Sequence, residues 1–172
     1  VRSRRQRQMC IRDRTYTVSC WVKRANNFGG YDGILSAFGA NNTYRHHIQF
    51  WSTAVLRVAG KNGSSSYIAD EATSAMFRDP SAWYHIVIIT DTNNSVTADR
   101  IRIYVNGVRL ALVAGPGGGV DPSQGQATVI NTAIQHKIGH DTDYSDYADM
   151  HITDYYFIDG YALGPENFGE YK

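Results

Sequence analysis

The chain has 172 residues, of which 42% are hydrophobic and 12% aromatic, with only 4 Pro and 16 Gly. This composition is typical of one globular domain and excludes a disordered or fibrous protein. No apolar run reaches the ~18 residues that a membrane helix needs, so we expect no membrane insertion.

The formal net charge of +1 hides an uneven distribution of charged residues. Residues 1–14 hold six arginines and one acidic residue, which leaves 11 basic and 15 acidic residues in the rest of the chain. A body with this acidic excess is poorly suited to nucleic acid, whose binding depends on neutralising phosphates. We therefore expect no nucleic-acid partner.

Residues 1–14 also differ from the rest of the chain in composition. We interpret them as a non-native tag or a disordered basic arm, because residues 9–14 (MCIRDR) are similar to the translated end of an adapter used in sequencing libraries. We assign residues 15–172 to one β-sandwich domain. If the segment is foreign, we expect the native chain to begin earlier, with a further strand before residue 15.

Beyond residue 15 the chain reads as many short strands separated by turn residues. Residues 15–23 alternate, with Tyr16, Val18, Cys20 and Val22 on one face, so Cys20 is expected to be a small buried residue. Residues 70–81 look irregular, with one helical turn near 71–76, and residues 114–125 look too glycine-rich to pack. The pattern favours an all-β sandwich or barrel. Further strands are predicted over 34–38, 44–51, 54–59, 67–69, 83–91, 100–105, 108–112, 128–131, 133–139 and 150–158.

The chain is organised around a hairpin between residues 83 and 113. Its first strand, WYHIVIITD, is apolar on both faces, which indicates a strand that is covered on both sides. The next run, RIRIYV, alternates cleanly and predicts a strand with one exposed face. Asn106 and Gly107 then supply the two positive φ angles of a type I′ turn, and Val108, Leu110 and Leu112 form the expected return strand.

Several of these motifs occur in the order found in a known family. The run from Trp83 to Val87, followed by Asp91 and then RIRIYVNG, resembles the central motif of laminin-G-like domains in the concanavalin A-like lectin/glucanase superfamily. The pairs Ile138-Gly139, Ala162-Leu163 and Pro165-Glu166 and the opening strand near residues 16–23 are similar to further parts of it. The likeness covers about 155 residues.

The resemblance implies a jelly-roll sandwich of two antiparallel sheets. In this superfamily ligands are expected on the concave face or on the loops at one rim, and many members bind sugars or proteins, often with calcium. The C-terminal sequence FIDGYALGPENFGEY further resembles that of domains in structural proteins of marine bacteriophages. The resemblance therefore suggests a virion as the location, with the bacterial surface or the extracellular medium as the alternative.

The acidic residues argue against an enzyme. Retaining glucanases of the superfamily place carboxylates along one strand with a two-residue spacing, so that acid and nucleophile share a cleft. The chain has only three glutamates, Glu71, Glu166 and Glu170, and none has an acidic residue two places away on a strand. No Gly-x-Ser-x-Gly motif frames a serine nucleophile. We expect no enzymatic activity.

One acidic cluster, HDTDYSDYADMH, has the chemistry of a calcium site, because calcium prefers oxygen ligands on a flexible loop. Its spacing does not fit an EF-hand, and the alternative is a solvated loop whose aspartates cap turns. We name Asp141 and Asp143 as candidate calcium ligands, with Asp32 as a weaker third. The histidines are scattered, and zinc is not expected.

Sugar binding is the remaining hypothesis, since aromatic rings stack on sugar faces while amides and carboxylates bind hydroxyls. The three tryptophans are interpreted as core residues, and His85 as a hydrogen-bonding residue between the sheets. We predict a non-enzymatic adhesion or structural module that contacts glycans or other virion proteins, with a bacterial lectin-like domain as the alternative and self-association into a homo-oligomer left open. The candidate ligand-binding residues, all on predicted loops, are Phe28, Tyr31, Asn41, Asn42, Tyr44, Tyr144 and Tyr147.

Overall fold

The structure is a computed structural model that describes residues 14–25, 30–39, 41–141 and 146–169. Apart from two short 3₁₀ turns, the regular elements of these residues are β-strands. The strands are β1 (Thr15–Arg24), β2 (Asp32–Phe38), β3 (Tyr44–Phe50), β4 (Val55–Asn62), β5 (Ala69–Met76), β6 (Tyr84–Asp91), β7 (Ile101–Val105), β8 (Val108–Arg109), β9 (Leu112–Ala114), β10 (Gln135–Ile138), β11 (His140–Asp141), β12 (Asp146–Tyr147) and β13 (Met150–Asp159).

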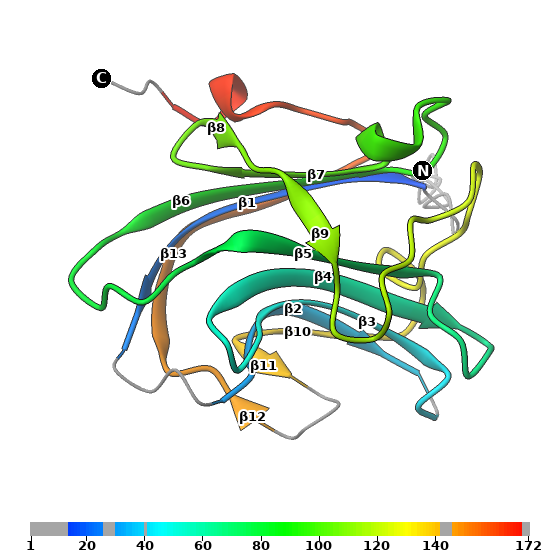
Figure 1. Ribbon diagram of the computed structural model, residues 1–172, viewed down its shortest axis with the longest axis horizontal. Coiled ribbons are helices and arrows are strands. Elements are labelled where there is room, and N and C mark those ends of the chain that lie inside the picture. The colour runs from blue at the N-terminus through cyan, green and yellow to red at the C-terminus, as the bar shows by residue number, and fades with distance from the viewer. Residues whose placement is uncertain (1–13, 26–29, 40, 142–145, 170–172) are drawn as a thin grey trace, which may run out of the picture.

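These strands form two stacked antiparallel sheets, as the sequence predicts. One sheet has five strands in the order β13-β1-β6-β7-β8, and the other has six in the order β10-β2-β3-β4-β5-β9. Strands β1, β6 and β13 arch over the six-stranded sheet, and the small β11–β12 hairpin lies against the opposite face of that sheet (Figure 1). The molecule is therefore an all-β sandwich with two outer faces and one core.

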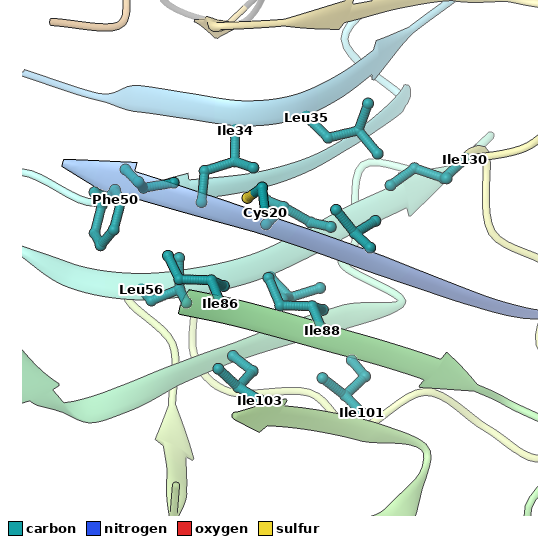
Figure 2. Close-up of a cluster of buried hydrophobic side chains, with 14 of the residues drawn as sticks. Cys20, Ile34, Leu35, Phe50, Leu56, Ile86, Ile88, Ile101, Ile103 and Ile130 are labelled. Carbon is teal, nitrogen blue, oxygen red and sulfur yellow. The ribbon is translucent and has the colours of Figure 1, made fainter. Parts of the chain in front are cut away.

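The core fills the space between the two sheets. Figure 2 shows Ile34 and Leu35 of β2 and Leu56 of β4 facing Cys20, Ile86 and other side chains of the five-stranded sheet. Every second residue of a regular strand points to the same face, and the consecutive residues Ile34 and Leu35 both reach the core because the pairing register of β2 with β3 shifts between Gly33 and Leu35. Cys20 is a free, fully buried thiol, as expected.

The predicted turn of the central hairpin is confirmed, but the prediction of one continuous return strand is wrong. Asn106 and Gly107 have φ angles of 49° and 79°, as a type I′ turn requires. The return strand is not continuous: β8 pairs with β7, whereas β9 pairs with β5 in the opposite sheet. The chain therefore crosses from one sheet to the other between Arg109 and Leu112 (Figure 1).

Strand β6 is apolar on both faces because both are covered, which confirms the prediction. Its Val87 and Ile89 point away from the core and are nevertheless buried. The C-terminal segment lies on this side of the five-stranded sheet, where the Thr17 hydroxyl donates to the carbonyl of Tyr161 at 2.7 Å and accepts from the Leu163 N–H at 2.9 Å.

Three predictions about irregular segments are wrong. Residues 69–76 form strand β5, because cross-strand pairing with β4 and β9 overrides their weak apolar pattern. Residues 128–131 form no strand, although residues 128–130 are buried. The glycine-rich segment after β9 packs against the protein, since Gly115 is buried and donates its N–H to the Asp70 carbonyl at 3.0 Å.

Candidate functional site

The candidate site is the outer face of the six-stranded sheet, on strands β3 and β4. Ile48 and Phe50 of β3 belong to the core, so the alternate residues of this strand point outward. Leu56 and Val58 of β4 likewise point inward. The outward residues are Arg45, His47 and Gln49 on β3 and Arg57, Ala59 and Lys61 on β4.

Pairing register brings these outward residues together in rows across the sheet. Arg45 lies opposite Lys61, and Gln49 lies opposite Arg57. Directly opposed residues of an antiparallel pair have Cβ atoms roughly 5 Å apart, so each row is one contact unit. Three cationic side chains therefore share this outer face.

All three cationic side chains lie close to the ring of Tyr67. The Lys61 Nζ lies 4.6 Å from the ring centroid, the Arg57 guanidinium 5.3 Å and the Arg45 guanidinium 5.9 Å. Arg45 also donates to the Tyr67 hydroxyl, with Nη2 at 3.2 Å from Oη. Cations within about 6 Å of an aromatic face are attracted by the ring quadrupole, which holds Tyr67 flat against this row.

A second aromatic group covers Arg57 from the other side. The Arg57 guanidinium lies 4.4 Å from the Trp51 ring, and the Trp51 and Tyr31 rings are 4.5 Å apart. These rings are partly exposed, so they present aromatic surface beside cationic groups. We call this set the aromatic-basic patch; it consists of Tyr31, Arg45, Trp51, Arg57, Lys61 and Tyr67.

A buried ion pair anchors the patch to β5. The Nε and Nη2 atoms of Arg57 each lie 2.7 Å from Oδ1 of Asp70, and both side chains are essentially inaccessible to solvent. A Cβ atom on Gly117 would lie 2.5 Å from the Tyr67 ring and 2.6 Å from Asp70 Oδ2. The chain can therefore pass this close to Tyr67 and Asp70 at position 117 only because glycine has no side chain.

Beneath the patch, three buried side chains keep unused hydrogen-bonding atoms. Within the described part of the chain, both amide atoms of Gln49, Nη1 of Arg57 and Nε2 of His47 have no hydrogen-bond partner. Burial, with the nearby Arg57, lowers the pKa of His47 well below its ordinary value, so the ring is neutral. Unpartnered buried polar atoms are costly, and these four lie on neighbouring outward-facing residues of β3 and β4.

The predicted ligand-binding residues do not form one cluster. Tyr31 lies in the patch, and Tyr147 is 82% exposed on β12, with its ring 4.6 Å from that of His140. Tyr44 and the adjacent turn residues Asn41 and Asn42 are exposed at the other end of β2 and β3, which for seven-residue strands is about 20 Å from Tyr31.

The remaining two predicted residues, Phe28 and Tyr144, lie outside the described residues. A single stacking surface made of all seven residues is therefore not what the described chain presents, and only Tyr31 contributes to the patch.

The predicted calcium ligands are only partly described. Asp143 lies outside the described residues, and Asp141 is fully buried at the start of the β11–β12 hairpin. Asp32 forms a buried ion pair with Arg24 at 2.6 Å and accepts the Asp149 N–H at 3.0 Å. Both carboxylate oxygens of Asp32 are therefore already engaged within the protein. Among the described residues no three His, Cys, Asp or Glu side chains are grouped closely enough to hold a metal ion.

The structure contradicts the predictions made for the three tryptophans and for His85. None of the three tryptophans belongs to the hydrophobic core, and Trp83 is 41% exposed. The His85 ring bonds the Ser19 hydroxyl at 3.0 Å within the five-stranded sheet, on its outer face, and does not connect the two sheets. Trp51 is the informative case, because its ring belongs to the patch.

A carboxyl pair that the sequence does not suggest occurs at the other edge of the sheet. The side chain of Glu71 is hydrogen-bonded to that of Asp121, 50 positions along the chain. Burial, reinforced by Asp121 and Asp70, raises the pKa of Glu71 from its ordinary value of 4.5 to about 7. The two residues line a cavity of about 320 Å³ next to Arg109, which forms an exposed ion pair with Asp99.

Two stacked antiparallel sheets of five and six strands define a β-sandwich. The family model described as concanavalin A-like lectin/glucanases superfamily, a laminin G model, matches residues 5–163. The chain therefore belongs to the concanavalin A-like lectin/glucanases superfamily. The predicted fold and laminin-G-like membership are both confirmed.

Solved structures share this fold at low sequence identity. The sialidase CBM40 module of Ruminococcus gnavus, bound to sialyllactose, has a TM-score of 0.57 and 10% identity over 91% of this chain and 82% of its own. Domain 4 of the arabinanase AbnA of Geobacillus stearothermophilus, in complex with arabinotriose, has a TM-score of 0.56 and 16% identity, over 92% of this chain and 66% of its own.

A third structure concerns botulinum neurotoxin type C, whose cell entry depends on two ganglioside molecules. It has a TM-score of 0.53 and 18% identity over 90% of this chain, but this chain covers only 34% of that one. At such identities these likenesses show the fold alone. No curated protein sequence matches the chain. Among the described residues no helix is long and apolar enough to span a membrane.

Proposed function

We propose that this chain is a non-enzymatic carbohydrate-binding module that recognises glycans through the aromatic-basic patch. The observation that carries the proposal is the arrangement around Tyr67, where one partly exposed ring is surrounded by three cationic side chains. An aromatic face binds the C–H groups of a sugar, and the adjacent N–H groups donate to its hydroxyl or carboxylate oxygens.

The unused polar atoms beneath the patch support the same proposal. Gln49 and Arg57 lie opposite each other, and each keeps hydrogen-bonding atoms without a partner in the described chain. Binding sites for hydroxyl-rich ligands need such groups, held in place by their surroundings. The Arg57–Asp70 ion pair and the Trp51 ring restrain the guanidinium. Ligand binding therefore does not carry the entropy cost of ordering this side chain.

The carbohydrate-binding proteins among the structural neighbours support this choice over a virion component. Domain 4 of AbnA and the CBM40 module are sugar complexes by their descriptions. None of the three structures named above is described as a virion component. A location outside the cell or on its surface accords with such a function and stays part of the proposal. The virion stays a prediction of the sequence.

Glycan binding can be tested directly with the Tyr67→Ala variant. A glycan array of neutral and acidic sugars identifies the ligand class, and calorimetry then measures its dissociation constant. We expect Tyr67→Ala to weaken binding about tenfold, because a stacking ring contributes roughly 1–1.5 kcal/mol beyond its buried area. Tyr161→Ala is the matched control, since Tyr161 is 65% exposed beside the five-stranded sheet.

Three outcomes would contradict the proposal. The first is no binding across the array, and the second is equal losses in Tyr67→Ala and Tyr161→Ala. The third is release of reducing sugar from any glycan, which would show that the Glu71–Asp121 pair or another group performs hydrolysis. Repeating the measurement with EDTA tests calcium at Asp141, since loss of binding on chelation would show that a metal ion holds the site together.

A further inference from the structure

A cavity opens between the two sheets at the β10 edge of the six-stranded sheet, whereas the aromatic-basic patch lies on the outer face of that sheet. Strands β13 and β10 are the edge strands of the five-stranded and six-stranded sheets, and side chains from both line this cavity. Its volume is about 310 Å³. An opening between two sheet edges leads toward the core, so core side chains such as Leu35 form part of its lining.

The walls of the cavity are apolar and well supported. Leu35 of β2 is 4% exposed, and the Phe157 ring stacks on Tyr16 with centroids 5.7 Å apart. Tyr155 completes this wall and packs against the core. Ile138 of β10 is 55% exposed, which marks the side where solvent reaches the cavity. An exposed apolar side chain at the entrance of an apolar cavity is stabilised when a ligand covers it.

Most polar side chains of the lining are already bonded within the protein; the exception is the hydroxyl of Tyr155, which is buried and has no hydrogen-bond partner in the described chain. The Asn131 amide donates to Asp159 at 2.5 Å, and the Thr132 hydroxyl donates to the carbonyl of Val129 at 2.7 Å. Both ring nitrogens of His136 are also engaged, Nε2 with the Asn131 N–H and Nδ1 with the carbonyl of Ile134. A polar ligand such as a sugar would therefore lose its hydrogen bonds to water and gain few in return.

The charge around the cavity restricts the ligand further. No Lys or Arg side chain lines it among the described residues, and Asp159 lies next to it through its bond to Asn131. A carboxylate on the ligand would find no cation and would be repelled by Asp159. The ligand class that fits best is thus uncharged as well as apolar.

We propose that this inter-sheet cavity binds the hydrocarbon chain of an uncharged amphiphile, such as an alkyl alcohol or alkyl glycoside. A cavity of about 150 Å³ lined by aliphatic and aromatic side chains can hold benzene, so 310 Å³ has room for an eight-carbon chain. The chain packs against Leu35 and Phe157, and its polar end lies beside Ile138 in solvent. The inference is independent of glycan binding.

An NMR titration of the full chain tests this site. Octan-1-ol and octanoate are added separately to protein labelled at Ile and Leu methyl groups, and the shifts of Ile138 and Leu35 are followed. We expect saturable shifts at these two methyl groups with octan-1-ol, and binding of octanoate that is weaker by roughly fivefold or more at neutral pH.

Two variants locate the site. Ile138→Ser should weaken octan-1-ol binding about tenfold, because it removes apolar contact at the entrance. Val108→Ser should leave it unchanged, since Val108 is 63% exposed on β8 at the opposite edge of its sheet. Absence of saturable shifts near Leu35, or equal binding by wild type and Ile138→Ser, would overturn the site. Equal affinity for octanoate would overturn the uncharged ligand class.

Discussion

Arg57 and Asp70 form a buried ion pair outside the hydrophobic core, with both Nε and Nη2 of Arg57 at 2.7 Å from one carboxylate oxygen. The pair connects two parts of the outer face. Asp70 also accepts the Gly115 N–H at its carbonyl, and Arg57 lies between the Trp51 and Tyr67 rings. Asp70 therefore positions the guanidinium of the patch through its carboxylate and the glycine-rich segment through its backbone carbonyl.

Replacing Asp70 by Asn should destabilise the protein by about 3 kcal/mol. The substitution leaves the Arg57 charge buried without a counter-ion, and breaking a buried pair from one side costs far more than the pair contributes. Chemical denaturation measures the free energy of unfolding. Glycan affinity should fall in the same variant, because the guanidinium loses the group that orients it.

The exposed ion pair Arg109–Asp99 provides the matched control. Its side chains are 44% and 32% exposed, with Nη2 at 2.6 Å from Oδ1. Asp99→Asn should change the free energy of unfolding by less than about 1 kcal/mol, because exposed pairs are screened by water. Equal losses in the two Asp→Asn variants would show that burial is not the reason for the cost.

Local pattern was sufficient for the strands that carry their own alternation. Tyr16 to Val22 and Ile101 to Val105 alternate cleanly, and the structure places both in strands whose apolar residues face the core. Strand β5 was missed, because Asp70 and Glu71 are buried by partners that are remote in sequence. Its pairing with β4 and β9 is a tertiary effect.

Part of the aromatic-basic patch could be predicted from the same alternation of residues along the strands. Arg45, His47 and Gln49 are spaced two apart, and so are Arg57 and Lys61, which places each set on one face of a strand. The alternation does not reveal that β3 and β4 pair with Arg45 opposite Lys61, or that Tyr67 closes over both. The aromatic loop residues chosen from chemistry alone were therefore mostly separated, with Tyr31 the exception.

Gly33 should be required for the seating of the β11–β12 hairpin on the outer face. A Cβ atom at this position would lie 2.6 Å from the carbonyl carbon and oxygen of His140, closer than any side chain tolerates. Gly33→Ala should push β11 away from β2 and break the bond from the Ser36 hydroxyl to the His140 carbonyl, now 2.8 Å. We expect a loss of about 1–3 kcal/mol on denaturation.

Gly30→Ala is the control for that substitution, because no heavy atom lies within 4 Å of a Cβ placed there. Its stability should match or slightly exceed that of the wild type, since alanine reduces the entropy of the unfolded chain. Hydrogen exchange at residues 140 and 141 should increase in Gly33→Ala and stay unchanged in Gly30→Ala. Unchanged exchange in both would contradict the close packing of β11 on β2.

Glu71 should make the fold less stable as the pH rises from about 4.5 to about 7. Its folded-state pKa of about 7 lies above the ordinary value of 4.5, so the folded protein binds the proton more tightly than the unfolded chain does. Glu71→Gln cannot ionise and should gain about 1 kcal/mol over the wild type at pH 8, after allowance for solvent screening. The two proteins should differ least near pH 4, and a constant difference at all pH values would refute this assignment.

His46 should act in the opposite direction over almost the same pH range. The ring is 1% exposed, and burial, with the nearby His136, lowers its pKa from 6.5 to about 4. Between pH 4 and pH 6.5 the unfolded chain therefore binds a proton at this residue, whereas the folded protein does not. The free energy of unfolding decreases as the pH falls from 6.5 toward 4. The loss from this group amounts to at most about 3 kcal/mol.

Since Glu71 and His46 oppose each other, Glu71 should offset part of the loss of stability that His46 causes as the pH falls from 6.5 to 4.5, and single variants are needed to separate them. His46→Gln has no such proton, so it should lose less stability than the wild type as the pH falls from 6.5 toward 4. The double variant His46→Gln/Glu71→Gln should show the flattest profile in thermal denaturation from pH 4 to pH 8. A His46→Gln profile parallel to that of the wild type would mean that another buried group, such as His47, carries the acid sensitivity.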